Sequence, residues 1–240
     1  MHKKTSFFVI TLAAPLLALA AGVANAGDEN ILILKQEGAG NEITVDQHNA
    51  TDSQVGGVAF NEANSLDQSS FNILDFDTNK AEALAHPLLQ IGNYNSASVT
   101  LTGRAGAVFL QQGGQITDGN NQAQIDINSG SAGGSLAAVL QDGSNNSATV
   151  TINGSLSQGN VLQQGDGNQG TVEVGTTNGL VDNVKASLTQ TGDNNDTSLS
   201  VIGISAGEYS YTVVGNNTTT SVPAVIVTNG ASVSITQSQF

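Results

Sequence analysis

Strict alternation of apolar and polar residues recurs along most of the chain and predicts β-strands. After Asn146 the chain reads SATVTIN, in which Ala, Val and Ile alternate with Ser and Thr, and the same alternation follows Asn168 and Asn195. Successive side chains of a strand point to opposite faces, so a period of two predicts strands with one buried face. Val, Ile and Thr also suit a pleated surface. The only helical signal is weak and lies at 78–85.

A short motif, Gln-x-Gly-x-x-Asn, separates the two predicted strands of each repeat. Its five strict copies contain Gln36, Gly38, Asn41, Gln90, Gly92, Asn95, Gln141, Gly143, Asn146, Gln163, Gly165, Asn168, Gln190, Gly192 and Asn195. Two copies are incomplete: one has Gln111 and a longer turn before Asn121, and one at Asn229 lacks the Gln. Gly permits a positive φ and Asn tolerates the left-handed region, so the motif predicts a tight turn.

The spacing of the repeats predicts a solenoid. Consecutive motif Asn residues lie 54, 26, 25, 22, 27 and 34 residues apart, a period typical of stacked repeats. The first gap is about two units long, so we expect an irregular segment or a degenerate repeat at 50–87. Stacking in register, about 4.8 Å per turn, would place Gln over Gln and Asn over Asn in hydrogen-bonded amide ladders. The expected fold is an all-β solenoid over 27–240 that continues as a cross-β amyloid fibre.

The first 26 residues have the order of a secretory signal peptide. Lys3 and Lys4 precede an apolar run at 7–21, and Ala24-Asn25-Ala26 is an A-x-A cleavage site. Cleavage is therefore predicted between Ala26 and Gly27. No later stretch is apolar enough to cross a bilayer as a helix.

The charge of the predicted mature chain limits the classes of partner that it is expected to bind. It keeps four Lys and Arg against 20 Asp and Glu, a formal net charge of −16. Such an acidic chain is not expected to bind nucleic acid or anionic lipid directly. It has no cysteine, so stability cannot come from disulfides.

No catalytic or metal site is expected. Acids in or beside the turns, which invite a calcium interpretation, are Asp142, Asp166, Asp193 and Asp196. A calcium loop needs further spaced carboxylates and a closing Glu, so we interpret these acids as turn formers and charges that slow premature stacking. His48 and His86 have no nucleophile or carboxylate at motif spacing, and Arg104 is the only arginine. We expect neither enzyme activity, nor a cofactor, nor a small-molecule substrate.

The repeat resembles the curlin repeat of bacterial curli fibre subunits. QEGAGNEITVDQ (36–47) has the full form with Gln36, Gly38, Asn41 and Gln47, and QIGNYNSA (90–97) and QDGSNNSA (141–148) match through the alanine. The resemblance covers about 31–47 and 88–237. It implies a secreted subunit that self-assembles into extracellular amyloid fibres (fimbria) at the bacterial surface, in biofilm matrix and adhesion. It also implies other curlin subunits or a nucleator as partners, and export through an outer-membrane curli channel with its chaperones.

The chain departs from the curlin pattern at the end of the second strand. The closing Gln is kept only at Gln47, and its equivalents are Leu101, Ile127, Ile152, Val174, Val201 and Ile235. One of the two polar ladders is thus expected to be apolar, which leaves open whether the chain is a major subunit, a nucleator or an accessory subunit. The alternative is a monomeric secreted solenoid that acts as an adhesin or binding module.

Overall fold

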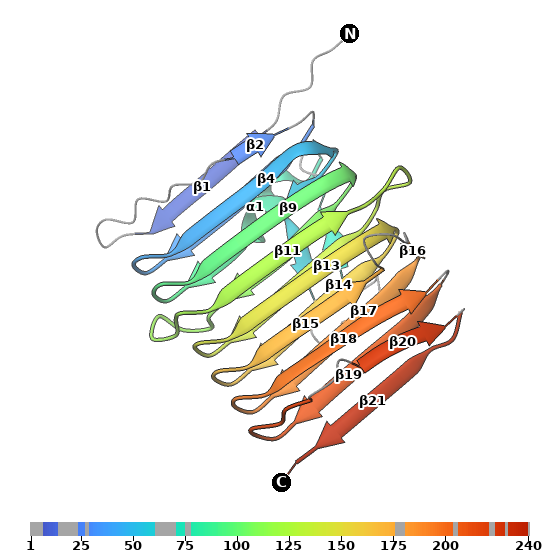
Figure 1. Cartoon of the computed structure of the whole chain (residues 1–240). Coiled ribbons are helices and arrows are strands. Elements are labelled where there is room, and N and C mark those ends of the chain that lie inside the picture. The colour runs from blue at the N-terminus through green and yellow to red at the C-terminus, as the bar shows by residue number, and fades with distance from the viewer. Residues whose placement is uncertain are drawn as a thin grey trace.

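The chain folds into a parallel β-solenoid of about seven turns with little helix, which confirms the expected all-β class (Figure 1). The computed structural model describes residues 7–13, 24–26, 29–60, 71–74, 78–175, 181–203, 206–220, 224–228 and 230–239. The predicted cleavage residue Gly27 and the motif residue Asn229 lie outside these ranges. No helix in the described part is long and apolar enough to cross a membrane.

Two parallel sheets form the walls of the solenoid. In the described part, the first sheet contains β1 (Phe7–Ala13), β3 (Ile31–Glu37), β5 (Gln54–Val55), β8 (Leu88–Ile91), β10 (Ala107–Gln112), β12 (Leu136–Asp142), β14 (Gln158–Gln164), β17 (Val184–Thr191), β19 (Gly207–Val214) and β21 (Val233–Ser238). The second contains β2 (Ala24–Ala26), β4 (Glu42–Thr51), β9 (Ser96–Arg104), β11 (Gln122–Asn128), β13 (Ser147–Ser155), β15 (Gln169–Val174), β16 (Val181–Asp182), β18 (Asp196–Gly203) and β20 (Ala224–Thr228). Each turn of the solenoid thus crosses both sheets.

The core lies between the two sheets and follows from the alternation. In β13 the apolar Ala148, Val150 and Ile152 are buried, and the register places them directly over the inward residues of β11 and β15. The same columns continue along the stack as one apolar cluster. A slip of one residue would turn every one of these side chains outward, so burial fixes the register.

The described part of 50–87 forms no separate turn of the solenoid and is irregular, the first of the two alternatives expected there. β5 pairs with the first half of β10, and β8 pairs with its second half, so the two short strands together fill one place in the first sheet. Residues 56–87 are therefore an insertion within a single strand. It contains an antiparallel hairpin of β6 (Val58–Phe60) and β7 (Phe71–Ile73) and the helix α1 (Lys80–Ala85), close to the helix expected at 78–85.

The insertion packs on the outer side of the first sheet. Phe60 stacks on Phe109 of β10, with ring centroids 4.8 Å apart, beside a small buried cluster that includes Val58 and Leu136. The period-two pattern could not reveal this arrangement, because the halves of the strand lie far apart in the sequence.

The assignment of the last repeat to Asn229 is wrong. A complete turn, β19 and β20, precedes 229, and β21 pairs with β19 in the first sheet. Ile226, not Ile235, therefore follows Val201 in the apolar column of the second sheet. The motif was missed because Val213 stands at the Gln position of this turn and Thr218 at its Asn position.

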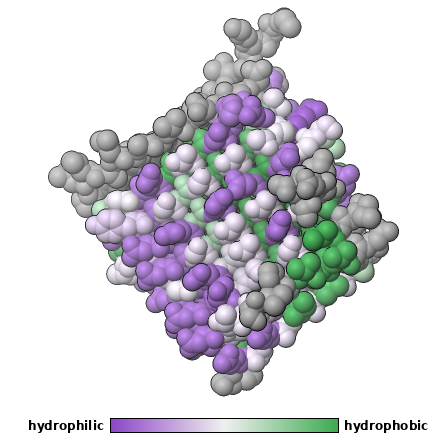
Figure 2. Space-filling view, viewed as in Figure 1, coloured by the Kyte–Doolittle hydropathy of each residue, from purple (hydrophilic) through white to green (hydrophobic). Residues whose placement is uncertain are grey.

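The outer face of the second sheet is mostly hydrophilic (Figure 2). Small polar residues such as Ser98, Thr149 and Thr171 point outward along it. An apolar area interrupts this face at the last strands, where the exposed Val225 and Val227 pair with residues of β18.

Candidate functional site

A glutamine ladder runs through the first sheet, as the sequence predicts. Its members, one in each of six successive turns, are Gln36, Gln90, Gln112, Gln141, Gln163 and Gln190. The Nε2 of each donates to the Oε1 of the next at 2.6 to 3.0 Å. All six side chains are buried, so these bonds satisfy groups that water cannot reach. The ladder has a direction, with donors facing the C-terminal end of the stack.

The second amide N–H of the glutamines ties the two sheets together. From Gln90 onward, Nε2 also donates to the first backbone carbonyl of the preceding second-sheet strand, at 2.7 to 3.1 Å. In the middle turns the opposing position on the second sheet holds a small residue: a Cβ on Gly170 would lie 2.9 Å from Oε1 of Gln190 and 3.1 Å from Nε2 of Gln163. The same closeness accounts for Ala97, Ala123 and Ala148 two positions after the motif Asn, whereas the outer turns hold the larger Ile43 and Thr197 there.

Gln112 occupies the ladder position that the motif spacing assigns to Gln111. The register pairs Gln112 with Gln90 and with Gln141, whereas Gln111 pairs with Leu140 and faces outward, half-buried. The motif spacing failed here because the turn before Asn121 is longer than the others. Strand alternation from the buried Val108 and Leu110 places Gln112 inward.

Alanine substitutions at these two adjacent residues should separate the interpretations. Gln112→Ala leaves one N–H of Gln90 Nε2 and the Oε1 of Gln141 buried without partners, and we expect it to lower the free energy of unfolding by about 2–4 kcal/mol. Gln111→Ala should change it by less than about 0.5 kcal/mol. Urea unfolding of freshly prepared protein, followed by circular dichroism, measures both. Equal losses would contradict the register described here.

An asparagine ladder lies at the turns. Its members are Asn41, Asn95, Asn121, Asn146, Asn168 and Asn195, and all are buried. Each Oδ1 accepts the backbone N–H of the residue in the same place one turn later, at 2.9 to 3.1 Å. Except in Asn95, Nδ2 donates to the glycine carbonyl of the next turn at 2.8 to 2.9 Å. Asn95 bonds the carbonyl of Ile91 instead, since the next turn is the longer one.

The motif glycines form a third column, in which the backbones of successive turns approach closely. Gly143, Gly165 and Gly192 have φ near +114°, and a Cβ on any of them would collide with the carbonyl oxygen of the glycine in the next turn. Gly38 and Gly92 meet the backbone of the following turn in the same way. The glycines are therefore required both by backbone conformation and by the distance between turns.

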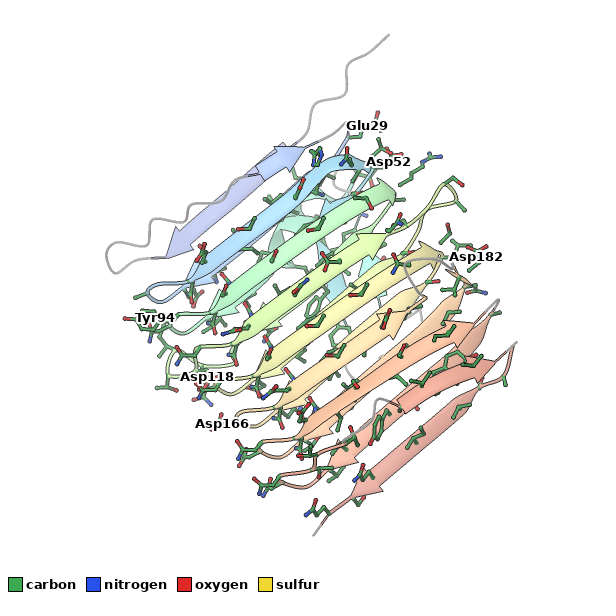
Figure 3. The ribbon with its side chains drawn as sticks, in the orientation of Figure 1. Glu29, Asp52, Tyr94, Asp118, Asp166 and Asp182 are labelled. Carbon is green, nitrogen blue, oxygen red and sulfur yellow. The ribbon has the colours of Figure 1, made fainter. Side chains whose placement is uncertain are left out.

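Acidic side chains at the turns also bond along the stack. Figure 3 shows Tyr94, Asp118 and Asp166 along one edge. Oδ1 of Asp166 accepts the backbone N–H of Ser144 at 2.7 Å, and Oδ1 of Asp193 accepts that of Asp166 at 2.9 Å. These carboxylates stabilise the turns but place like charges in adjacent turns, as expected of turn-forming, charge-bearing residues.

A serine corner at the opposite edge was not anticipated. This edge carries Glu29, Asp52 and Asp182 (Figure 3). Buried Ser135 donates from Oγ to a backbone carbonyl of the same turn at 2.7 Å and accepts the N–H of Ser157 from the next turn at 3.3 Å. The available signal was the Ser that immediately precedes strands β5, β12 and β14.

Gln47 does not belong to the glutamine ladder. It is buried at the head of the column formed by Leu101, Ile127, Ile152, Val174, Val201 and Ile226. The expected replacement of one polar ladder by an apolar one is thus present, with Ile226 in place of Ile235.

Charged groups pair along the surface. Nζ of Lys185 lies 3.1 Å from Oε1 of Glu208 in the next turn.

The pKa of Asp46 is lowered because its carboxylate accepts the backbone N–H of His48. Burial raises the pKa of Tyr211. Within the described ranges, no three His, Asp or Glu side chains gather where they could hold a metal ion.

Comparison with known proteins gives no match: no family model matches this sequence, and no curated protein or solved structure does either.

Proposed function

We propose that the chain is a curlin-like secreted structural subunit that self-assembles into extracellular amyloid fibres. The observation that carries the proposal is that each described turn presents the same ladder groups to the next, from Gln36 to Gln190. A contact set that repeats between turns of one molecule can also be made between turns of two molecules, because each ladder bond requires only another turn in register.

The open edge at β21 supports polymerisation over a capped monomer. Capped solenoids cover their end turns, and sheet edges of soluble proteins commonly carry charge or proline against strand addition. At the C-terminal end, the edge strand β21 reads VSITQS and has no charged residue. It offers a row of backbone groups to another chain.

Partners and location follow from the same proposal. The predicted leader, the acidic surface and the curlin-like motif support a fibre at the bacterial cell surface, within biofilm matrix and in adhesion. The partners are then further copies, other curlin subunits or a nucleator, and an outer-membrane channel with chaperones. We propose a structural rather than an enzymatic role, since the repeated residues serve contacts between turns.

Diffraction from the chain 27–240, left at neutral pH, tests the proposal. We expect sedimenting fibres with reflections near 4.7–4.8 Å and about 10 Å, formed after a lag that seeds abolish. A folded monomeric solenoid has the same strand spacing, so sedimentation and seeding are the measurements that distinguish a fibre from a monomer. A monomer that stays soluble at high concentration, with a β spectrum, would instead favour a binding module that uses the Ser and Thr face.

Two asparagine variants with equal added charge refine this test. Asn146→Asp puts a carboxylate against the Gly165 carbonyl that Nδ2 now bonds at 2.8 Å, and we expect it to slow fibre formation severely. Asn153→Asp adds the same charge at a half-buried position of β13 outside the ladders and should slow it much less. Equal kinetics for the two variants would count against amide stacking as the basis of assembly.

A further inference from the structure

The glutamine ladder is unfinished at its N-terminal end. Gln36 is only 3 % exposed, and its Nε2 donates to Gln90, but its Oε1 is buried without a hydrogen-bond partner. In every later member of the ladder this oxygen accepts a bond from the preceding turn. Gln36 therefore lacks a donor from the side that faces away from Gln90.

At the other end of the stack, Gln237 of β21 stands in the same column as the ladder, and its Nε2 lacks an acceptor. The register places it over Val213, which lies over Gln190. Its Oε1 accepts a bond from the Tyr211 hydroxyl at 2.7 Å, as a ladder glutamine accepts one from the preceding turn. No group in the described part of the chain accepts a bond from its Nε2.

The edge at β3 is built to receive a parallel strand, because β1 of the predicted leader pairs with it. The backbone register places Phe8, Ile10 and Leu12 over the inward residues Leu32, Leu34 and Gln36 of β3. Likewise, β2 pairs with β4 in the second sheet. Removal of the leader at the predicted site would uncover both edges.

The inward residues of β21 match those of β3. Val233 and Ile235 continue the apolar columns of the first sheet and remain half-exposed. Set on β3 in register, they would cover Leu32 and Leu34. The Nε2 of Gln237 would then face the Oε1 of Gln36, which gives both groups their missing partner with the donor direction of the ladder preserved.

We propose that β21 of one copy docks on β3 of the next, in the place of β1, and joins the two glutamine ladders through Gln237 and Gln36. This inference rests on the proposed function and specifies the joint, which is the contact between β21 of one copy and β3 of the next copy in the fibre. It also makes the leader strand a cap: an uncleaved chain can add to a growing end through β21 but presents no free β3 edge afterwards.

A disulfide test reads the joint directly, because the chain has no cysteine of its own. In the proposed register, the outward Thr236 lies beside the outward Lys35 of the next copy. Neighbouring strands are about 4.8 Å apart, within the Cα range of a disulfide. A Lys35→Cys, Thr236→Cys variant of 27–240 should form covalent multimers upon assembly. Because the two residues lie at opposite ends of one stack, the bond must join two copies.

Lys35→Cys with Thr212→Cys is the matched control. Thr212 pairs with Thr236 and lies one strand further inside the stack, so its distance from Lys35 of the next copy is about twice that of Thr236. This distance is too long for a disulfide, and the variant should form no covalent multimers. Fibres of the Thr236 variant without covalent multimers would overturn the joint and leave the proposed function standing. If the unsubstituted chain forms no fibres, the proposed function itself fails, and the joint with it.

A separate experiment tests whether the uncleaved leader stops elongation of the fibre. A small molar fraction of the full chain 1–240, added to elongating 27–240, should shorten the fibres seen by electron microscopy, whereas the same amount of extra 27–240 should not. Unchanged fibre lengths would overturn the cap.

Discussion

Gly165→Ala should destabilise the solenoid by at least about 3 kcal/mol, because it combines two mechanisms that each produce large losses. Gly165 has φ +114°, outside the region open to alanine. Its new Cβ would also collide with the carbonyl oxygen of Gly192 in the next turn, which cannot move without separating the turns. Urea unfolding of 27–240 before fibres form measures the loss.

Gly134→Ala separates these two causes. Gly134 also has a positive φ, +78°, but its Cβ would meet only the tip of the half-exposed Leu156 side chain. We expect a loss of about 1–2 kcal/mol, the cost of the left-handed region alone. If Gly165→Ala costs no more than Gly134→Ala, the close approach of the turns does not limit the glycine column.

Asn168→Ala should lower the free energy of unfolding by about 3 kcal/mol or more, because several buried groups lose their partner at once. Oδ1 of Asn168 accepts the backbone N–H of Asn195 at 3.1 Å, and Nδ2 donates to the Gly192 carbonyl at 2.8 Å. Nδ2 also lies 3.2 Å from Oδ1 of Asn146. Water cannot replace these bonds, since the site is fully buried. The same unfolding measurement applies.

Thr218→Ala is the matched control in the same column. The Thr218 hydroxyl donates to Oε1 of Gln239 at 3.2 Å, and its backbone N–H already bonds Asn195. Its removal breaks one side-chain bond, so we expect a loss of only about 1 kcal/mol. A loss as large as that of Asn168→Ala would mean that simple burial, rather than the forward reach of the amide, sets the cost in this column.

Most of the ladder arrangement could be predicted from local spacing. In the strict copies, such as Gln141 to Asn146, a period of two defines the inward face and the motif defines the turn. Where turn lengths are equal, stacking of like on like follows, because any other register would bury charged or polar groups without partners. The apolar column that replaces the second polar ladder could be predicted for the same reason.

The assignment of ladder residues from the sequence is wrong where a turn changes length or lacks the motif residues. The long turn before Asn121 shifted the Gln by one position, and only pairing with Gln90 and Gln141 identifies Gln112 as the ladder member. The turn with Val213 and Thr218 has no motif to detect, although its backbone repeats that of its neighbours.

By itself, the sequence determined the strand-turn-strand unit, its inward face and the chemistry of its ladders, because alternation, glycine and amide spacing act within a few residues. Only the tertiary structure decided which segments share a turn. It joined β5 and β8 across an insertion, placed β21 in the first sheet, and left Gln36 and Gln237 with unmade bonds at the two ends of one column. These features depend on pairing between strands distant in the sequence, where backbone hydrogen bonds and burial select the partner and local pattern carries no signal.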